Sequence, residues 1–328
     1  MKIIAEILSI VILLAGMASC AKTDRFYGNP QKEIAMNPVM HSMTKAEVPG
    51  PVTGSQYPDA EHFGVIAYYS PLFTDGQKWT SLTSVQPYFE NREFAKESDT
   101  FSGSPKCYWP HQGSLVFAGY SPFNAEKESV TFDPVEKTLT ITGFESDGQT
   151  DLMYFLPEVF DGSLVGLNSG ASSVLAVFSH ALSLVEFNVK GVDNDETVKL
   201  KGITFKGIPH MGTLTADASG CNWDEDDLSS PGDLPVFSSV DGEVLSSETP
   251  VTATSLVIPG SAVNIDLAYD AVGATSHPKT GTITPENAVM EWVAGKKYIY
   301  NLTIRSGFIV VESVTTSYIE ENESGAEI

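Results

Sequence analysis

Cys20 is the residue whose chemistry the sequence marks most clearly. It follows the basic residue Lys2, a short apolar run over residues 7–15, and small residues directly before the cysteine. This order is typical of a lipoprotein signal peptide, whose cleavage leaves the cysteine as the new N-terminus, acylated on its thiol and its amine. An uncleaved membrane helix is the alternative, but the apolar run is much shorter than the roughly 20 residues that span a bilayer. We therefore predict removal of residues 1–19 and lipidation of Cys20.

Other residues that could do chemistry are isolated from one another. The six histidines show no metal-ligand spacing, and His180, just before an apolar alternating run, is better interpreted as a side chain at a strand edge than as a ligand. The acidic run at residues 224–227 could hold calcium, but it lacks the spaced ligands and turn glycine of a calcium loop, so a solvated loop is favoured. No nucleophile elbow, phosphate loop or zinc motif is present. The sequence thus predicts no enzyme, no metal and no cofactor.

Composition limits the partners of the chain. The 328 residues include 42 acidic and 19 basic side chains, giving a formal net charge of -23. Such a surface repels phosphate backbones, so nucleic acid is excluded as a partner. Besides Cys20, the cysteines are Cys107 and Cys221; a disulfide between them is possible, but two isolated buried thiols are the preferred interpretation.

Alternation of apolar and polar residues with period two dominates the chain and predicts an all-β sandwich protein. One change in the phase of the alternation, between Leu200 and Ile203, predicts a β-bulge at Gly202. The clearest expected strands cover residues 114–120, 138–142, 184–190, 263–269 and 298–304.

Three segments depart from this pattern. Residues 86–98 suggest a short helix, and residues 229–248 suggest a long polar loop. Residues 157–173 are rich in glycine, serine and aspartate and suggest a connection between two domains. We therefore expect, in order, a signal peptide, a propeptide and two β-sandwich domains, covering residues 1–19, 20–45, 46–160 and 174–328.

Four segments, in this order, resemble the fimbrillin family, the lipoprotein-derived subunits of type V pili. The first is Tyr57-Pro58 with an apolar run that follows, and the second is Tyr108-Trp109-Pro110 followed by a strand that ends at Ser121-Pro122. The third contains His180, and the fourth begins at Trp292. Their ranges are 57–68, 108–122, 178–187 and 292–302.

The resemblance implies two tandem transthyretin-like β-sandwiches. It also implies a route of assembly. The precursor would reach the outer membrane as a surface-exposed lipoprotein, and an extracellular trypsin-like protease would remove the lipid together with the first strand. The groove left behind would accept a C-terminal strand from another subunit, which builds the fimbrium. The partners implied are other pilus subunits, the outer membrane before processing, and a surface ligand for adhesion.

Local residues fit the processing step. Residues 33–43 carry apolar side chains suited to a removable strand and are followed by Thr44-Lys45, where the family usually has Thr-Arg. Lys45 is therefore the candidate cleavage position, although an ordinary exposed loop lysine is the alternative. Arg25 is a rival basic site, but it lies too near Cys20 to release a whole strand.

The C-terminal segment over residues 308–319 has the character of a donor strand. Its even-numbered apolar residues Phe308, Val310, Val314 and Tyr318 are expected on one face, interrupted by polar residues. The alternative is that this segment is the last strand of its own domain.

Three functions remain open at this point. The chain could be a pilus subunit of the shaft or tip that is processed and polymerised, or an anchor that keeps its lipid. It could instead be a surface glycan-binding lipoprotein, with Trp79 and Trp223 as sugar platforms, although packing of these rings within their own domain is favoured. A hydrolase has no residue to support it.

Overall fold

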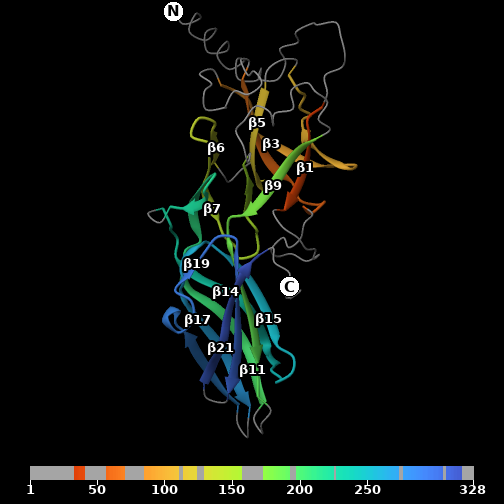
Figure 1. The fold of residues 1–328 in the computed structure, drawn as a ribbon. Coiled ribbons are helices and arrows are strands. Elements are labelled where there is room, and N and C mark those ends of the chain that lie inside the picture. The colour runs from red at the N-terminus through yellow and green to blue at the C-terminus, as the bar shows by residue number, and fades with distance from the viewer. Residues whose placement is uncertain are drawn as a thin grey trace, which may run out of the picture.

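The structure is a computed structural model, and it describes residues 33–40, 57–70, 85–110, 114–123, 129–156, 173–192, 197–224, 227–272, 276–305 and 308–319. Figure 1 shows the N-terminal strands at one end of the molecule and the C-terminal strands at the other. The prediction of an all-β chain is confirmed, since strands account for nearly all regular structure. No helix in the described part of the chain has the length and apolar character needed to cross a membrane.

Seven strands of the N-terminal half form a closed barrel. Aromatic side chains from these strands, among them Phe63, Phe94 and Phe178, fill much of its core. In barrel order the strands are β1 (Ala35–Met40), β4 (Thr100–Ser104), β3 (Gln86–Glu97), β2 (Phe63–Ser70), β5 (Ser114–Ser121), β8 (Met153–Phe155) and β9 (Val174–His180).

The helix expected over residues 86–98 is wrong, because this segment is strand β3. Its two buried side chains, Phe89 and Phe94, are five residues apart and so differ in parity. The register against β2 shifts between them, and Asn91 adopts a positive φ of 38°. A bulge of this kind breaks the period-two pattern, and the spacing then resembles that of a helix.

The C-terminal half is a sandwich of two four-stranded sheets around a separate apolar core. One sheet has the order β15 (Val251–Val257), β10 (Ser183–Lys190), β20 (Lys296–Arg305) and β21 (Phe308–Tyr318). The other has the order β14 (Gly232–Val244), β11 (Thr197–Ile208), β17 (Asn264–Val272) and β18 (Ser276–Ile283). The bulge predicted at Gly202 is confirmed, since the register of β11 shifts between Leu200 and Gly202 against both neighbours.

The polar loop expected over residues 229–248 is wrong, because most of it is strand β14. This strand lies at the edge of its sheet, and among residues 232–244 only Leu234 is buried. An edge strand with so little buried surface needs few apolar residues, so its composition resembles that of a loop.

A third sheet lies between the barrel and the sandwich. Its core contains residues from both halves, including Ile319 directly after β21. Because two of its strands precede residue 160 and two follow residue 174, this sheet crosses the expected domain boundary. In sheet order the strands are β13 (Gly220–Trp223), β12 (Met211–Asp217), β7 (Thr138–Glu145) and β6 (Ser129–Asp133). The short strands β16 (Gly260–Ser261) and β19 (Glu291–Trp292) pair with each other near the 3-10 helix η3 (Pro285–Asn287).

Candidate functional site: strand β1 and edge strand β21

Strand β1 lies between β4 and β9 and closes the barrel (Figure 1). It runs parallel to β9 over residues 36–40. On the other side it pairs with β4 only at Ala35 and Met36. The pairing on the β4 side is thus much shorter than the pairing on the β9 side. The closure of the barrel along β1 therefore relies on packing of side chains as well as on backbone hydrogen bonds.

Buried side chains alternate along this segment with side chains that are partly buried or exposed. Ile34, Met36, Pro38 and Met40 are buried, whereas Asn37 between them is exposed. Pro38 has no N–H group, so it donates no hydrogen bond to either neighbouring strand. The strand thus contributes more by burial of apolar surface than by backbone pairing.

Aromatic rings pack in the barrel core beneath β1, and the rings of Tyr57, Phe63, Phe101 and Phe178 are called the aromatic floor. Phe101 of β4 and Phe178 of β9 belong to the strands that flank β1, and the ring of Phe63 lies 5.4 Å from each of them. Tyr57 stacks on Phe178 at 5.0 Å, and its hydroxyl is 2.6 Å from the Ser121 hydroxyl. Burial raises the pKa of Tyr57, so the hydroxyl stays protonated. Loss of β1 would expose this aromatic cluster to water.

Polar contacts hold the beginning of this segment. The Ile34 N–H donates to the Cys107 carbonyl at 2.8 Å, and the Lys106 ammonium lies 3.1 Å from the carboxylates of both Glu33 and Glu97. Hydrogen bonds first to Glu33 and then to Glu97 raise the pKa of Lys106. Because Lys106 and Glu97 are exposed and Glu33 is only partly buried, the pairs orient the segment but add little to stability.

Cys107 is a natural reporter for the presence of β1. Its side chain is 5% exposed and belongs to the same core cluster as Ile34 and Met36. Cys221 is also not in a disulfide, and burial raises its pKa to about 11, so at pH 8 little of it is the reactive thiolate.

We expect both thiols to resist alkylation at pH 8 while β1 is in place. After proteolytic removal of β1, Cys107 should be labelled and Cys221 should not, because only the cover of Cys107 has left. Peptide mapping by mass spectrometry of a chain that begins at residue 21 measures this, and a Cys221→Ser variant serves as the control. Continued protection of Cys107 after loss of β1 would show that β1 does not shield it.

Strand β21 lies at the edge of its sheet and pairs antiparallel with β20 along its whole length. None of residues 308–318 is fully buried, and Phe308 and Tyr318 are 57% and 50% exposed. The following residue, Ile319, is buried, and its N–H donates to the Gly295 carbonyl at 3.0 Å. In this structure the segment is therefore the last strand of its own domain. A role as donor strand stays a prediction.

The four candidate donor residues do not share one face of β21. A bulge shifts the register between the residues opposite Asn301 and Leu302. Val314 pairs with the core residue Tyr300, whereas Val310 pairs with Thr303 and lies on the other side. The core side is formed by Ile309, Val311 and Val314. The sequence does not reveal this change of face, because a bulge in the backbone alters the side to which later residues point without altering the residues themselves.

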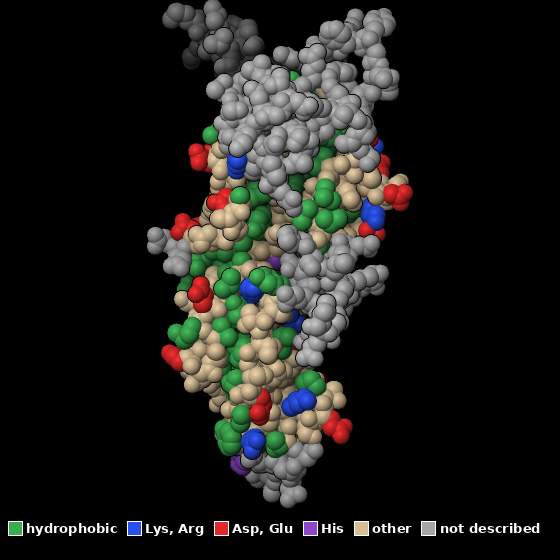
Figure 2. Space-filling view, viewed as in Figure 1, with side chains coloured by type: hydrophobic (Ala, Val, Ile, Leu, Met, Phe, Trp, Pro, Cys, Tyr) green, Lys and Arg blue, Asp and Glu red, His purple; other side chains and the backbone are tan. Residues whose placement is uncertain are grey.

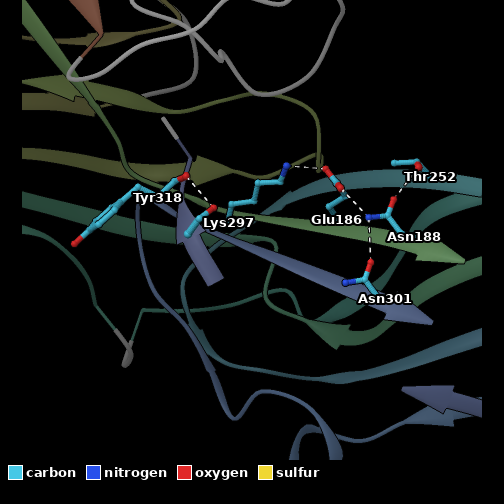
Figure 3. A network of polar contacts seen from close by, with 7 residues as sticks. Glu186, Asn188, Thr252, Lys297, Asn301 and Tyr318 are labelled. Carbon is cyan, nitrogen blue, oxygen red and sulfur yellow. Dashed lines mark hydrogen bonds and ion pairs between the residues drawn. The ribbon is translucent and has the colours of Figure 1, made fainter. Parts of the chain in front are cut away.

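Polar side chains form a row across the outer face of the β15-β10-β20-β21 sheet (Figure 3). The Thr252 hydroxyl donates a hydrogen bond to the Asn188 side-chain oxygen at 2.8 Å, and the Asn188 amide nitrogen donates to the Asn301 side-chain oxygen at 3.5 Å. The Asn301 amide nitrogen in turn donates to the Ser313 hydroxyl at 3.0 Å. Beside the row, the Lys297 ammonium is 2.9 Å from the Glu186 carboxylate. These groups satisfy one another and link β21 to β20, so the row stabilises the sheet edge.

The remaining candidate residues have structural roles. His180 is the last residue of β9, where it pairs with Met153 of β8, and it is buried with Nδ1 2.9 Å from the Asp151 carboxylate. Trp223 is 5% exposed, and its indole N–H donates to the Ala181 carbonyl at 2.9 Å. Trp223 is thus buried, but in the core that both halves share, where its ring packs on Phe144. Trp79 lies outside the described residues.

Charged groups do not gather into a catalytic or metal site in the part of the chain that the structure describes. No three or more His, Cys, Asp or Glu side chains there are arranged to hold a metal ion. On the face seen in Figure 2, lysine, arginine and acidic side chains are scattered rather than collected in one patch.

Two predicted positions, Cys20 and Lys45, lie outside the described residues. The structure brings together residues that the sequence did not connect, namely Glu33 with Lys106 and β1 with β9. Partners more than 70 residues apart leave no local signal in a single sequence, so neither contact could be found by pattern.

Fold and site together define an all-β chain with a barrel closed by its first described strand and a sandwich that ends in a long edge strand. Residues 51–321 match the fimbrillin-like family, and the chain belongs to it. No curated protein matches the chain.

Solved structures resemble this fold at low sequence identity. One is a candidate cell adhesion protein from Bacteroides uniformis, with a TM-score of 0.50 and 16% identity, covering 88% of this chain and 99% of that one. Another, from Bacteroides ovatus, has a TM-score of 0.51 and 14% identity, covering 88% and 97%. At such identities the likeness concerns the fold alone.

Proposed function

We propose that this chain is a structural subunit of a type V pilus that is exported as a lipoprotein through Cys20, cut after Lys45, and polymerised by exchange of β1 for a strand of another subunit. The observation that supports it best is the position of β1. This strand closes the barrel with three buried side chains, Ile34 directly before it is buried as well, and Met40 at its end precedes Lys45 by only five residues in the sequence. A cut after Lys45 would separate β1 from the rest of the chain.

Removal of β1 creates a surface that a monomer does not tolerate. It leaves unpaired backbone groups on β9 and β4 and exposes the aromatic floor. Addition of a strand from a neighbour restores both the hydrogen bonds and the burial. If the cut after Lys45 did not occur, the subunit would remain a lipid-bearing anchor. If it donated no strand to a neighbour, or received none, it would lie at the end of the pilus, for example at the tip. The burial of Trp223 removes one of the two sugar platforms of the glycan-binding alternative.

Mild trypsin treatment of the purified precursor tests the proposal. We expect a new N-terminus at Ala46 and a ladder of oligomers that resist heating in detergent, because each added strand buries several apolar side chains. A Lys45→Gln variant should stay uncut there and monomeric, and an Arg25→Gln variant should behave like the wild type. A full-length, lipid-bearing chain as the sole form on cells would exclude the processed shaft subunit.

A further inference from the structure

The four buried positions of the β1 segment describe the strand that can replace it. Ile34, Met36, Pro38 and Met40 occupy every second position and are buried, while Asn37 faces solvent. Because side chains of a strand alternate between its two faces, a replacement strand must carry four apolar side chains at successive alternate positions.

The surroundings of these positions make polar replacements unfavourable. Met36 pairs with Phe101 and Met40 pairs with Phe178, and both rings pack on Phe63. A hydroxyl or carboxylate placed among these rings gives up its hydrogen bonds to water. The groove therefore selects strongly against any strand with a polar residue at one of the four inward positions.

The C-terminal segment of this chain does not meet the requirement in either phase. Over residues 308–319 its even-numbered residues are interrupted by a carboxylate and a hydroxyl, and its odd-numbered residues by three hydroxyls. The two phases read Phe308, Val310, Glu312, Val314, and Ile309, Val311, Ser313, Thr315. In its own sheet β21 needs a bulge to bring Val314 to the core side. Beyond Ile319, four of the last nine residues are glutamates, so this part is even less suited.

We infer that the groove of this subunit is filled by a strand from a different chain, one that carries apolar side chains at four successive alternate positions, and not by the C-terminal segment of a second copy. This inference rests on the proposed exchange of β1. It makes the subunit a member of a mixed polymer, in which its own C-terminal segment serves a different neighbour or remains in its own sandwich.

A displacement experiment on the full chain tests the inference. A recognition sequence for a site-specific protease, placed between residues 43 and 46, allows the folded protein to be cut while β1 stays bound. Exchange is then followed with a fluorescent peptide of residues 31–41. The competitors are the native peptide of residues 306–319, its Ser313→Val/Thr315→Leu variant, and its Thr316→Val/Ser317→Leu variant.

The two variant peptides gain similar apolar surface, but only the first has four apolar side chains in succession on one face. We expect the Ser313→Val/Thr315→Leu peptide to displace the fluorescent peptide at a concentration at least about a hundredfold lower than the native peptide needs. The Thr316→Val/Ser317→Leu peptide should resemble the native one. Equal displacement by the native peptide and the Ser313→Val/Thr315→Leu peptide would overturn the inference and make a second copy the occupant.

Exchange with the unlabelled peptide of residues 31–41 separates this inference from the proposed function. If that peptide displaces the fluorescent one, the groove exchanges strands, and the competitors decide between the two sources. If it does not, strand exchange at this groove is itself wrong, and the inference falls with it.

Discussion

Met36→Asp is expected to expel β1 from the barrel of the full chain. Met36 is completely buried and pairs with strands on both sides. Removal of a buried methionine side chain costs about 2–5 kcal/mol, and an unpaired carboxylate in an apolar core costs several kcal/mol more. Together these effects should outweigh the backbone pairing of β1, at two positions with β4 and five with β9, so β1 should leave while the rest of the chain stays folded.

Hydrogen exchange of residues 33–40 measures this effect, and gel filtration shows whether the opened barrel associates with other copies. Asn37→Asp, one residue along the same strand, is the matched control. Its side chain points to solvent, so its effect on the free energy of unfolding should stay within about 0.5 kcal/mol. Wild-type protection of residues 33–40 in the Met36→Asp protein would mean that burial of Met36 does not hold β1 in the barrel.

Strands β10 and β20 were predictable because buried and partly buried residues alternate over much of their length, whereas β5 was predictable as a largely apolar run, since residues 115–121 are all buried. The expected segments around residues 114–120, 184–190 and 298–304 correspond to β5, β10 and β20. Period-two patterning reports burial on one face, and these strands lie inside their sheets, with neighbours on both sides.

The errors follow from irregular backbone and from edges. The bulge in β3 near Asn91 changed the parity of Phe89 and Phe94, and the bulge in β21 separated Val310 from Val314. Strand β14 buries only Leu234 within residues 232–244, so its apolar signal was weak. A bulge therefore led to a helix prediction for β3 and to a wrong shared face for β21, and the small buried surface of β14 led to a loop prediction.

The candidate site was predictable only in part. Residues 33–43 were recognisable as a possible strand, and the structure places β1 within them. The parallel pairing with β9 joins residues more than 130 positions apart, and no local pattern encodes such a contact. The close approach of β2 and β5 is similar: a Cβ atom at Gly119 would collide with the Phe155 ring and the Gly64 carbonyl. The sequence shows a glycine there without showing what lies against it.

Phe63→Ala is expected to lower the free energy of unfolding by about 3–5 kcal/mol, which is a large part of the roughly 5–15 kcal/mol that stabilises a typical domain. Phe63 is completely buried. Its ring lies within 5.3–6.5 Å of five other rings, those of Tyr57, Phe94, Phe101, Phe155 and Phe178. Because the Phe63 ring contacts rings on both strands that flank β1, the cavity left by alanine should also weaken the packing of β1 in the barrel.

Denaturant unfolding measures the loss of stability, and hydrogen exchange of residues 33–40 measures the loosening of β1. Phe308→Ala is the control, since Phe308 is 57% exposed and its removal should change the free energy of unfolding by no more than about 0.5 kcal/mol. If Phe63→Ala lowers stability but leaves the exchange of β1 unchanged, the aromatic floor supports the barrel without holding β1. A loss below 1 kcal/mol would mean that neighbouring rings collapse into the cavity, and the groove would then be more adaptable than its packing suggests.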